Sequence, residues 1–274
     1  MSWNRTIILA GLFLLLSCKT NVFTGKKTLN FMSNSQLFPM AFAQYDDFLN
    51  QNNVVTGTSE AKMIEDVGNK IRIAAQRWLS ALGEEAYLKD YKWEYNLVKD
   101  ETVNAWCMPG GKIVFYTGIL PICQGESGVA VVMGHEVAHA LADHGAQRMS
   151  AAQVQALGAV GVAVGSQVAG ANQQTQQILN QAYGLGSQLG GMLPFSRSHE
   201  TEADKIGLYL SAIAGYDPYE APELWKRMKA VSGGQAPPEF LSTHPSNDSR
   251  IEFLNQLAPK AKEEAKKYGV TSFK

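Results

Sequence analysis

The sequence is poor in cysteine and has no excess of charge of either sign. Its 274 residues include three cysteines, too few for a disulfide framework. The 24 Lys and Arg residues balance 25 Asp and Glu residues, so a basic face for nucleic acid is not expected. With 45% hydrophobic and 18% charged residues, the composition excludes a disordered or fibrous chain and favours a compact enzyme or binding domain.

The sequence also has no apolar run of the roughly 20 residues that a transmembrane helix needs. Residues 7–16 are apolar and follow Arg5, a pattern typical of a signal peptide. The run ends at Leu15-Leu16-Ser17-Cys18, which resembles the lipobox of bacterial lipoproteins; an ordinary signal with an incidental cysteine is the alternative. We therefore expect residues 1–17 to be removed and Cys18 to carry lipid. This predicts an exported bacterial lipoprotein, anchored to a membrane on the periplasmic side of the outer membrane.

Domain organisation follows from composition. Residues 18–34 are polar and turn-rich and are expected to form a lipidated tether, whereas residues 35–274 are expected to form one domain. Export would place Cys107 and Cys123 in an oxidising compartment. They either pair or stay as buried thiols, and the sequence leaves both alternatives open.

Hydrophobic periodicity predicts the main elements of this domain. Residues 52–58 are expected to be a loop, with Ser59 capping the helix that follows. Helices are expected over 35–50, 59–82, 126–147, 198–214 and 218–231, with a helix pair over 246–268; strands are expected over 91–97, 105–108 and 112–117.

Residues 149–196 carry no charged side chain. A pair of closely packed helices or a flexible flap would explain this composition. The alternative is a surface that touches lipid or unfolded substrate.

The strongest motif is His135-Glu136-Val137-Ala138-His139. On a helix, residues four apart lie one turn apart on one face, so both imidazoles can bind one tetrahedral zinc ion. Glu136 lies beside them and can take a proton from a zinc-bound water. The alternative is two solvated histidines on a surface helix. It disagrees with the apolar residues around the motif, because buried histidines need partners.

A catalytic zinc ion usually has three protein ligands, so a third ligand is required. Glu200 and Asp204 lie four apart on a second predicted helix and share a face. One carboxylate can bind the metal while the other accepts the N–H of a ligand histidine. Glu202 is assigned to the solvated face, and His199 points about 100° away from Glu200 and is left out of the site.

Several further motifs follow in order along the chain: Asn104-Ala105, Pro109-Gly110-Gly111, Ser196-Arg197, and Thr243-His244-Pro245 with Arg250 after it. Together with His-Glu-x-x-His and Glu-x-x-Ala-Asp, they resemble the gluzincin zinc metallopeptidases of the HtpX and Oma type, which are related to the CAAX prenyl endopeptidases. The match is greatest with the small lipoprotein members of the LoiP and BepA kind. The resemblance implies an α+β fold, a mainly helical zincin-type domain with a small antiparallel sheet beside the active-site helix.

The resemblance also implies roles for single residues. His135, His139 and Glu200 would hold one Zn²⁺ per chain, Glu136 would be the general base, and Asp204 would orient a ligand histidine. Asn104 and Ala105 would lie on an edge strand that pairs with an extended substrate. Arg250 would stabilise the oxyanion or orient the loop, unless it is only a surface cation.

His244 has three alternative roles. Pro245 holds it in an extended backbone, from which its imidazole can reach the open position on zinc. There it would cap the metal in the resting state, which is the role we favour, or it would donate a hydrogen bond to the oxyanion. The third alternative is a loop histidine with no role in the site.

These observations predict a membrane-anchored zinc metalloendopeptidase that cleaves unfolded or misassembled envelope polypeptides. The alternative is a zinc-dependent chaperone or assembly factor for envelope proteins with little proteolysis. A third hypothesis is a structural lipoprotein with a degenerate site, which the complete ligand set disfavours.

Overall fold

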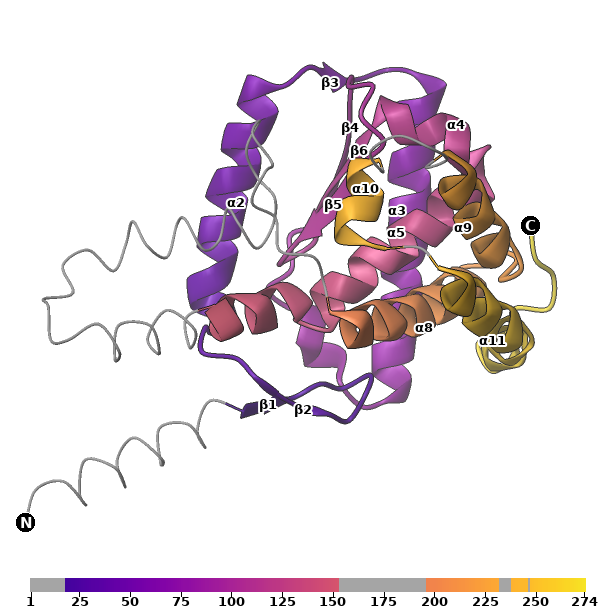
Figure 1. Ribbon diagram of the computed structural model, residues 1–274. Helices are drawn as coiled ribbons and strands as arrows, with labels where there is room; N and C mark the ends of the chain where they lie inside the picture. Colours follow the sequence, from indigo (N-terminus) through magenta and orange to yellow (C-terminus); the bar gives the residue numbers. More distant parts are fainter. Residues whose placement is uncertain (1–17, 153–195, 232–237, 246) are drawn as a thin grey trace, which may run out of the picture.

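The computed structural model describes residues 18–152, 196–231, 238–245 and 247–274 (Figure 1). The predicted signal segment 1–17 and most of the uncharged segment 149–196 lie outside these residues. In chain order the elements are β1 (Cys18–Thr20), β2 (Lys27–Leu29), α2 (Asn34–Gln51), β3 (Val54–Val55), α3 (Ser59–Ala81), η1 (Glu85–Leu88), β4 (Glu94–Val98), β5 (Ala105–Met108), β6 (Lys112–Tyr116), η2 (Thr117–Ile119), α4 (Leu120–Cys123), α5 (Glu126–Leu141), α8 (Arg197–Ile213), α9 (Glu220–Val231), α10 (Glu239–Thr243) and α11 (Asp248–Lys266).

A four-stranded sheet lies between α2 on one face and α3 and α5 on the other (Figure 1). Its order is β3-β4-β6-β5, and β4 pairs with β6 in parallel, so the sheet is mixed rather than antiparallel as predicted. The β5–β6 hairpin is confirmed. Its turn contains Gly110 and Gly111 with φ angles of 83° and 86°, a conformation that other residues disfavour. The hairpin leaves β5 on the edge of the sheet.

Several predicted boundaries are corrected by tertiary contacts. The loop 52–58 contains β3, whose two residues pair with β4. The N-cap of α3 is Thr58, whose hydroxyl accepts from the Ala61 amide. The strand predicted over 91–97 begins only at Glu94, because the Lys92 amide before it donates to the Gly110 carbonyl of the hairpin turn.

The C-terminal helix pair is a single helix, α11. Its buried residues form one apolar stripe that packs on α8 and α9, and this packing stabilises the whole length despite the internal Pro259. None of the helices in the described ranges has the length and hydrophobicity to cross a bilayer.

The crossing of α5 and α8 is the contact that positions the site. Gly134 and Gly207 meet there, and a Cβ on either one would lie 2.7 Å from backbone atoms of the other helix. The Ser211 hydroxyl donates to the Ala130 carbonyl at 2.9 Å beside this contact. The absence of two side chains therefore lets the two helix backbones touch, one residue before His135.

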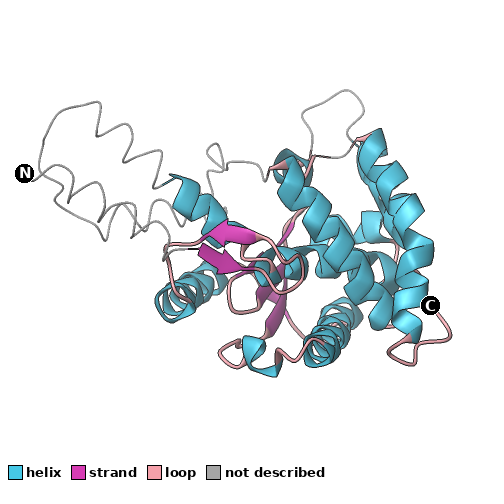
Figure 2. Ribbon diagram, turned by 90° about the horizontal axis from the view of Figure 1, so that it is seen from below, coloured by secondary structure: helices cyan, strands magenta, loops and turns pink. Residues whose placement is uncertain are grey.

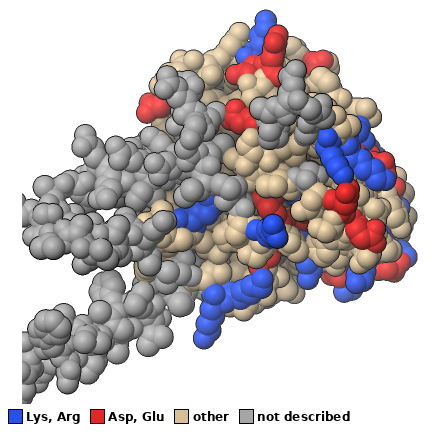
Figure 3. Space-filling model, in the orientation of Figure 1, with Lys and Arg blue, Asp and Glu red and all other residues tan. Residues whose placement is uncertain are grey.

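Residues 18–34, predicted as a tether, contain the β1–β2 hairpin, which Figure 2 shows from below. Phe23 packs edge-on against Trp78 of α3, with ring centroids 5.0 Å apart. The hairpin therefore lies against the domain. On the face seen in Figure 3, acidic and basic side chains intermingle among uncharged ones.

Candidate metal centre

Four buried side chains carried by three helices converge on one point. α5 presents His135 and His139 on one face, one turn apart, and Glu200 lies in the first turn of α8. His244 is the C-cap residue of the five-residue helix α10. One nitrogen or oxygen atom from each of the four lies within 4.8 Å of the others. The structure thus brings together all four residues that the sequence predicted as metal ligands.

The spacing of these atoms fits a zinc ion. His135 Nε2 lies 3.1 Å from His139 Nε2 and 3.1 Å from His244 Nδ1, and Glu200 Oε1 lies 3.4 Å from His139 Nε2. Two ligands on a tetrahedral zinc with bonds of about 2.0–2.1 Å lie about 3.3 Å apart. Three buried imidazoles that turn nitrogen atoms toward one another and toward a carboxylate are the donor set expected around this cation.

Burial and neighbouring charges together shift the pKa values of the residues in the cluster. Burial alone would raise the pKa of Glu200, but His244 and Arg250 beside it hold that pKa well below its ordinary range. Burial lowers the pKa of His139 well below its ordinary value, which keeps the imidazole neutral and able to donate a lone pair to a metal. The site therefore offers an anionic ligand and a neutral ligand side by side.

Glu136 is buried next to the cluster. Its Oε1 atom lies 3.4 Å from His244 Nε2 and accepts no hydrogen bond from the residues that the structure describes. Burial raises the pKa of this carboxyl above its usual range. A raised pKa is the direction that suits a general base, because such a base works best when its pKa approaches the operating pH.

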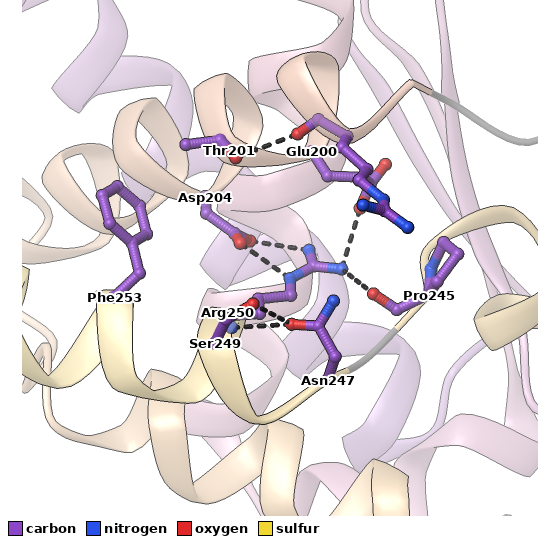
Figure 4. Close-up of a pocket in the computed structure, with 9 residues that line it drawn as sticks. Glu200, Thr201, Asp204, Pro245, Asn247, Ser249, Arg250 and Phe253 are labelled. Carbon is purple, nitrogen blue, oxygen red and sulfur yellow. Dashed lines mark hydrogen bonds and ion pairs between the residues drawn. The ribbon is translucent and has the colours of Figure 1, made fainter.

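Arg250 and Asp204 support the cluster from α11 and α8 (Figure 4). The Arg250 guanidinium donates to Asp204 through Nε at 2.7 Å and Nη2 at 2.6 Å, and its Nη1 lies 2.8 Å from Glu200 Oε2. Nη1 also donates to the Pro245 carbonyl at 3.2 Å. Asp204 Oδ1 in turn lies 3.1 Å from Nδ1 of His135.

Arg250 is therefore no surface cation, because it is buried and stacked on Trp225 with Cζ 3.4 Å from the ring centroid. Its donors hold two carboxylates and the loop that carries His244. A cavity of about 510 Å³ opens beside this network, and Figure 4 shows the residues that line it.

Asn104 and Ala105 lie at the start of the edge strand β5, as predicted, and both are buried. α10 covers this end of the strand: the Asn104 side-chain amide donates to Glu239 at 2.8 Å, and the Phe240 amide donates to the Val103 carbonyl at 3.1 Å. The helix that delivers His244 is thus attached to the strand end beside the metal centre.

One prediction about the acidic side chains is wrong. Glu202 was assigned to the solvated face, but its side chain is mostly buried and lies 3.2 Å from Nε2 of His144. Sequence reasoning missed His144 altogether, because it lies five residues after His139 and a straight helix would turn it away. His199 lies outside the four-residue cluster, stacked on the His144 ring at 4.3 Å.

The two cysteines of the domain, Cys107 and Cys123, are buried and free. Of the two alternatives, a disulfide or two buried thiols, the structure shows the buried thiols. Burial raises the pKa of both, that of Cys123 to about 12.

Comparison with known proteins identifies relatives of this chain. It is 41% identical to "Mitochondrial metalloendopeptidase OMA1" of Schizosaccharomyces pombe over 176 residues, 64% of this chain and 49% of that protein. It is 38% identical to the Saccharomyces cerevisiae protein of the same name over 209 residues, 73% of this chain and 56% of that protein. The "Beta-barrel assembly-enhancing protease" of Escherichia coli is 31% identical over 179 residues, 61% of this chain and 35% of that protein.

These relatives correct the predicted location. The two mitochondrial proteins match this chain at higher identity than the Escherichia coli protein does. The prediction of an exported bacterial lipoprotein on the periplasmic side of the outer membrane is therefore wrong. Acylation of Cys18 stays a prediction.

The family itself is clear. The chain spans about half the length of the two mitochondrial relatives. Residues 73–258 match "Peptidase family M48" and include every residue of the cluster. This match confirms the predicted resemblance to a zinc metallopeptidase family, and the His/His/Glu/His geometry is consistent with the predicted zinc site. The chain belongs to peptidase family M48.

Proposed function

We propose that this protein is a zinc metalloendopeptidase in which His135, His139 and Glu200 hold one Zn²⁺ per chain. The observation that carries this proposal is the convergence of four buried ligand atoms within 4.8 Å, with the Glu136 carboxylate beside them. A bound zinc ion would supply Lewis acidity, which lowers the pKa of water and polarises a peptide carbonyl.

Glu136 is the general base of this proposal. It takes a proton from the attacking water and passes it to the amine of the leaving peptide. Asp204 accepts the N–H of His135, so that Nε2 of that imidazole faces the metal, and Arg250 holds the Asp204 and Glu200 carboxylates in place. Arg250 is therefore a positioning residue, since its donors already serve these groups.

His244 caps the site in the resting state. Its Nδ1 lies 3.0 Å from Glu200 Oε1 and 3.1 Å from His135 Nε2, which is a ligand position, while its Nε2 faces the base. An imidazole in this position excludes both water and a substrate carbonyl. Proteolysis then requires α10 to move away.

The substrate is an unfolded or misassembled polypeptide, and the activity serves protein quality control. β5 is an edge strand in the described part of the chain, and an extended substrate can add to it through backbone hydrogen bonds, which carry little sequence information. The cover that α10 places on Asn104 and Val103 keeps folded proteins from this edge. The assembly-enhancing role in the name of the Escherichia coli relative supports substrates of this kind.

The test compares the full chain with Glu136→Gln, which keeps the size of the side chain but cannot take the proton. We expect about one zinc per chain in both proteins by metal analysis. Casein cleavage should stop with a chelator and fall by about 10²–10⁴-fold in the variant. Normal turnover by Glu136→Gln would overturn the mechanism. Zinc-dependent suppression of aggregation without any cleavage would instead establish the chaperone alternative.

A further inference from the structure

A second histidine and a second carboxylate lie directly behind the ligand histidine His139. Nδ1 of His144 lies 3.0 Å from Nδ1 of His139, and Nε2 of His144 lies 3.2 Å from Glu202 Oε2. His144 is fully buried, whereas Glu202 reaches the surface, where Lys26 of the N-terminal hairpin pairs with it. The four side chains form one line from the metal centre to the hairpin.

An interruption of the helix after α5 brings His144 next to His139. Residues five apart on a straight helix point about 140° away from each other, so His144 would normally face away from His139. Here α5 ends at Leu141, and Asp143 adopts a left-handed conformation with a φ of 57°. Helical residues resume at His144, and the Tyr87 hydroxyl donates to the Leu141 carbonyl at the break at 2.7 Å. The redirected chain turns His144 back onto His139.

The hydrogen atoms in this line have one consistent order. When Nε2 of His139 binds the metal, its Nδ1 carries the proton and can only donate. Nδ1 of His144 then accepts, so the His144 proton is on Nε2 and is donated to Glu202. Lys26 donates to the other oxygen of Glu202. Each neutral imidazole is thereby fixed in a single tautomer.

We infer that His144 and Glu202 are positioning residues that fix the tautomer and the orientation of His139 for metal binding. This inference rests on the proposed function, in which His139 is a ligand. His135 meets its carboxylate, Asp204, directly, whereas His139 meets Glu202 through an intervening imidazole. The polarisation that a carboxylate gives to a zinc-bound histidine is therefore relayed over one more residue.

The test measures metal affinity instead of proteolysis. His144→Phe keeps a ring of similar size but cannot accept from His139. Competition with a chromophoric chelator should show zinc bound about 10–100-fold more weakly, the range for loss of such a support. His144→Asn places its side-chain oxygen near the position of Nδ1, so it should restore most of the affinity. The absorption spectrum of the Co²⁺-substituted protein should shift in His144→Phe and return in His144→Asn.

Two controls separate positioning from folding. His199→Phe changes the neighbouring stacked ring, which lies outside the four-residue cluster, and should leave zinc affinity unchanged. Glu202→Gln should weaken zinc binding less than His144→Phe, while Glu263→Gln, which removes the acid of an exposed pair with Lys266, should not weaken it. Thermal melting of each metal-free variant shows whether the fold survives.

The outcomes distinguish this inference from the proposed function. If the parent protein binds one zinc ion and His144→Phe binds it equally well, the relay is refuted and the peptidase proposal stands. Equal losses in His144→Phe and His144→Asn, with no change in the Co²⁺ spectrum, would also refute it. A parent that binds no zinc, or whose Glu136→Gln variant cleaves normally, contradicts the proposed function itself.

Discussion

Two parts of the metal centre are held in different ways. α5 and α8 carry His135, His139 and Glu200, and their backbones touch at Gly134 and Gly207. α10 carries His244, and it has only five residues. We refer to the first part as the locked half and to α10 with His244 as the displaceable half.

The displaceable half is attached to the sheet by two hydrogen bonds, whereas the helices of the locked half touch through their backbones. α10 reaches the sheet through the Phe240 amide on Val103 and the Asn104 amide on Glu239. The backbone bond contributes only about 0.5–1.5 kcal/mol to stability, and the bond to the Glu239 carboxylate about 1.5–3 kcal/mol. The apolar contacts of Phe240 add to these, with its ring stacked on Trp225 at 5.9 Å. In the proposed function, the ligands would therefore be fixed where the metal stays bound and movable where the substrate enters.

The largest expected effect comes from the ion pair behind the locked half. Asp204→Asn removes one of the two carboxylate charges that face Arg250 in the interior, and breaking a buried pair costs up to about 3–5 kcal/mol. We expect chemical denaturation to show a loss of stability of this size and zinc affinity to fall as well. The control is Asp66→Asn, whose exposed pair with Lys62 should contribute less than about 1 kcal/mol. Equal losses in the two variants would contradict the assigned role.

A smaller loss is expected at the helix crossing. The Cβ of Gly207→Ala would lie 2.7 Å from the backbone of Gly134 and force α5 and α8 apart, at a cost of about 1–3 kcal/mol. Thermal melting and zinc titration should both report this change. Ser211→Ala at the same crossing loses one hydrogen bond without a clash and should cost about 1 kcal/mol. A fully stable Gly207→Ala protein with unchanged zinc affinity would show that the close packing of α5 on α8 does not hold the ligands of the locked half.

His244→Ala tests the displaceable half directly. Removal of the cap should raise basal casein cleavage several-fold, and the zinc content should stay near one per chain because the locked half is intact. Ser242→Ala, an exposed change on the same helix, should leave the rate unchanged. A fall by about 10²–10³-fold would instead identify His244 as an oxyanion donor.

The smallest expected effect is at the attachment of α10. Glu239→Ala removes the acceptor of the Asn104 amide but leaves the Phe240–Val103 bond in place. Basal cleavage should rise less than in His244→Ala, and amide exchange should quicken at residues 103–105. If exchange quickens in α8 to the same extent, the two halves open together.

Local patterns predicted much of this structure because they depend on residues close in sequence. The helical spacing of His135 and His139, the shared face of Glu200 and Asp204, and the glycine turn between β5 and β6 are all properties of single elements. The predictions failed where distant segments meet. The parallel pairing of β4 with β6 depends on the sheet as a whole.

The missed support of His139 has the same origin. Its alignment with His144 depends on a left-handed residue at Asp143 and on Tyr87, which is far away in sequence. The signal for the helix crossing was present: Gly134 and Gly207 lie inside helices, where glycine costs stability and needs a packing reason. Only the assembled fold shows that the two glycines pack against each other, so that neither position has room for a side chain.

The buried thiols have a practical consequence for watching the displaceable half. A thiol reacts as its thiolate, so burial and a raised pKa make Cys107 and Cys123 poor targets for alkylating labels. With Cys18 replaced by serine, a cysteine introduced at the exposed Ser242 would be the preferred site for a spin label or fluorophore. The two native cysteines of the core would thus remain unlabelled, and the label at position 242 would report the position of α10 during turnover.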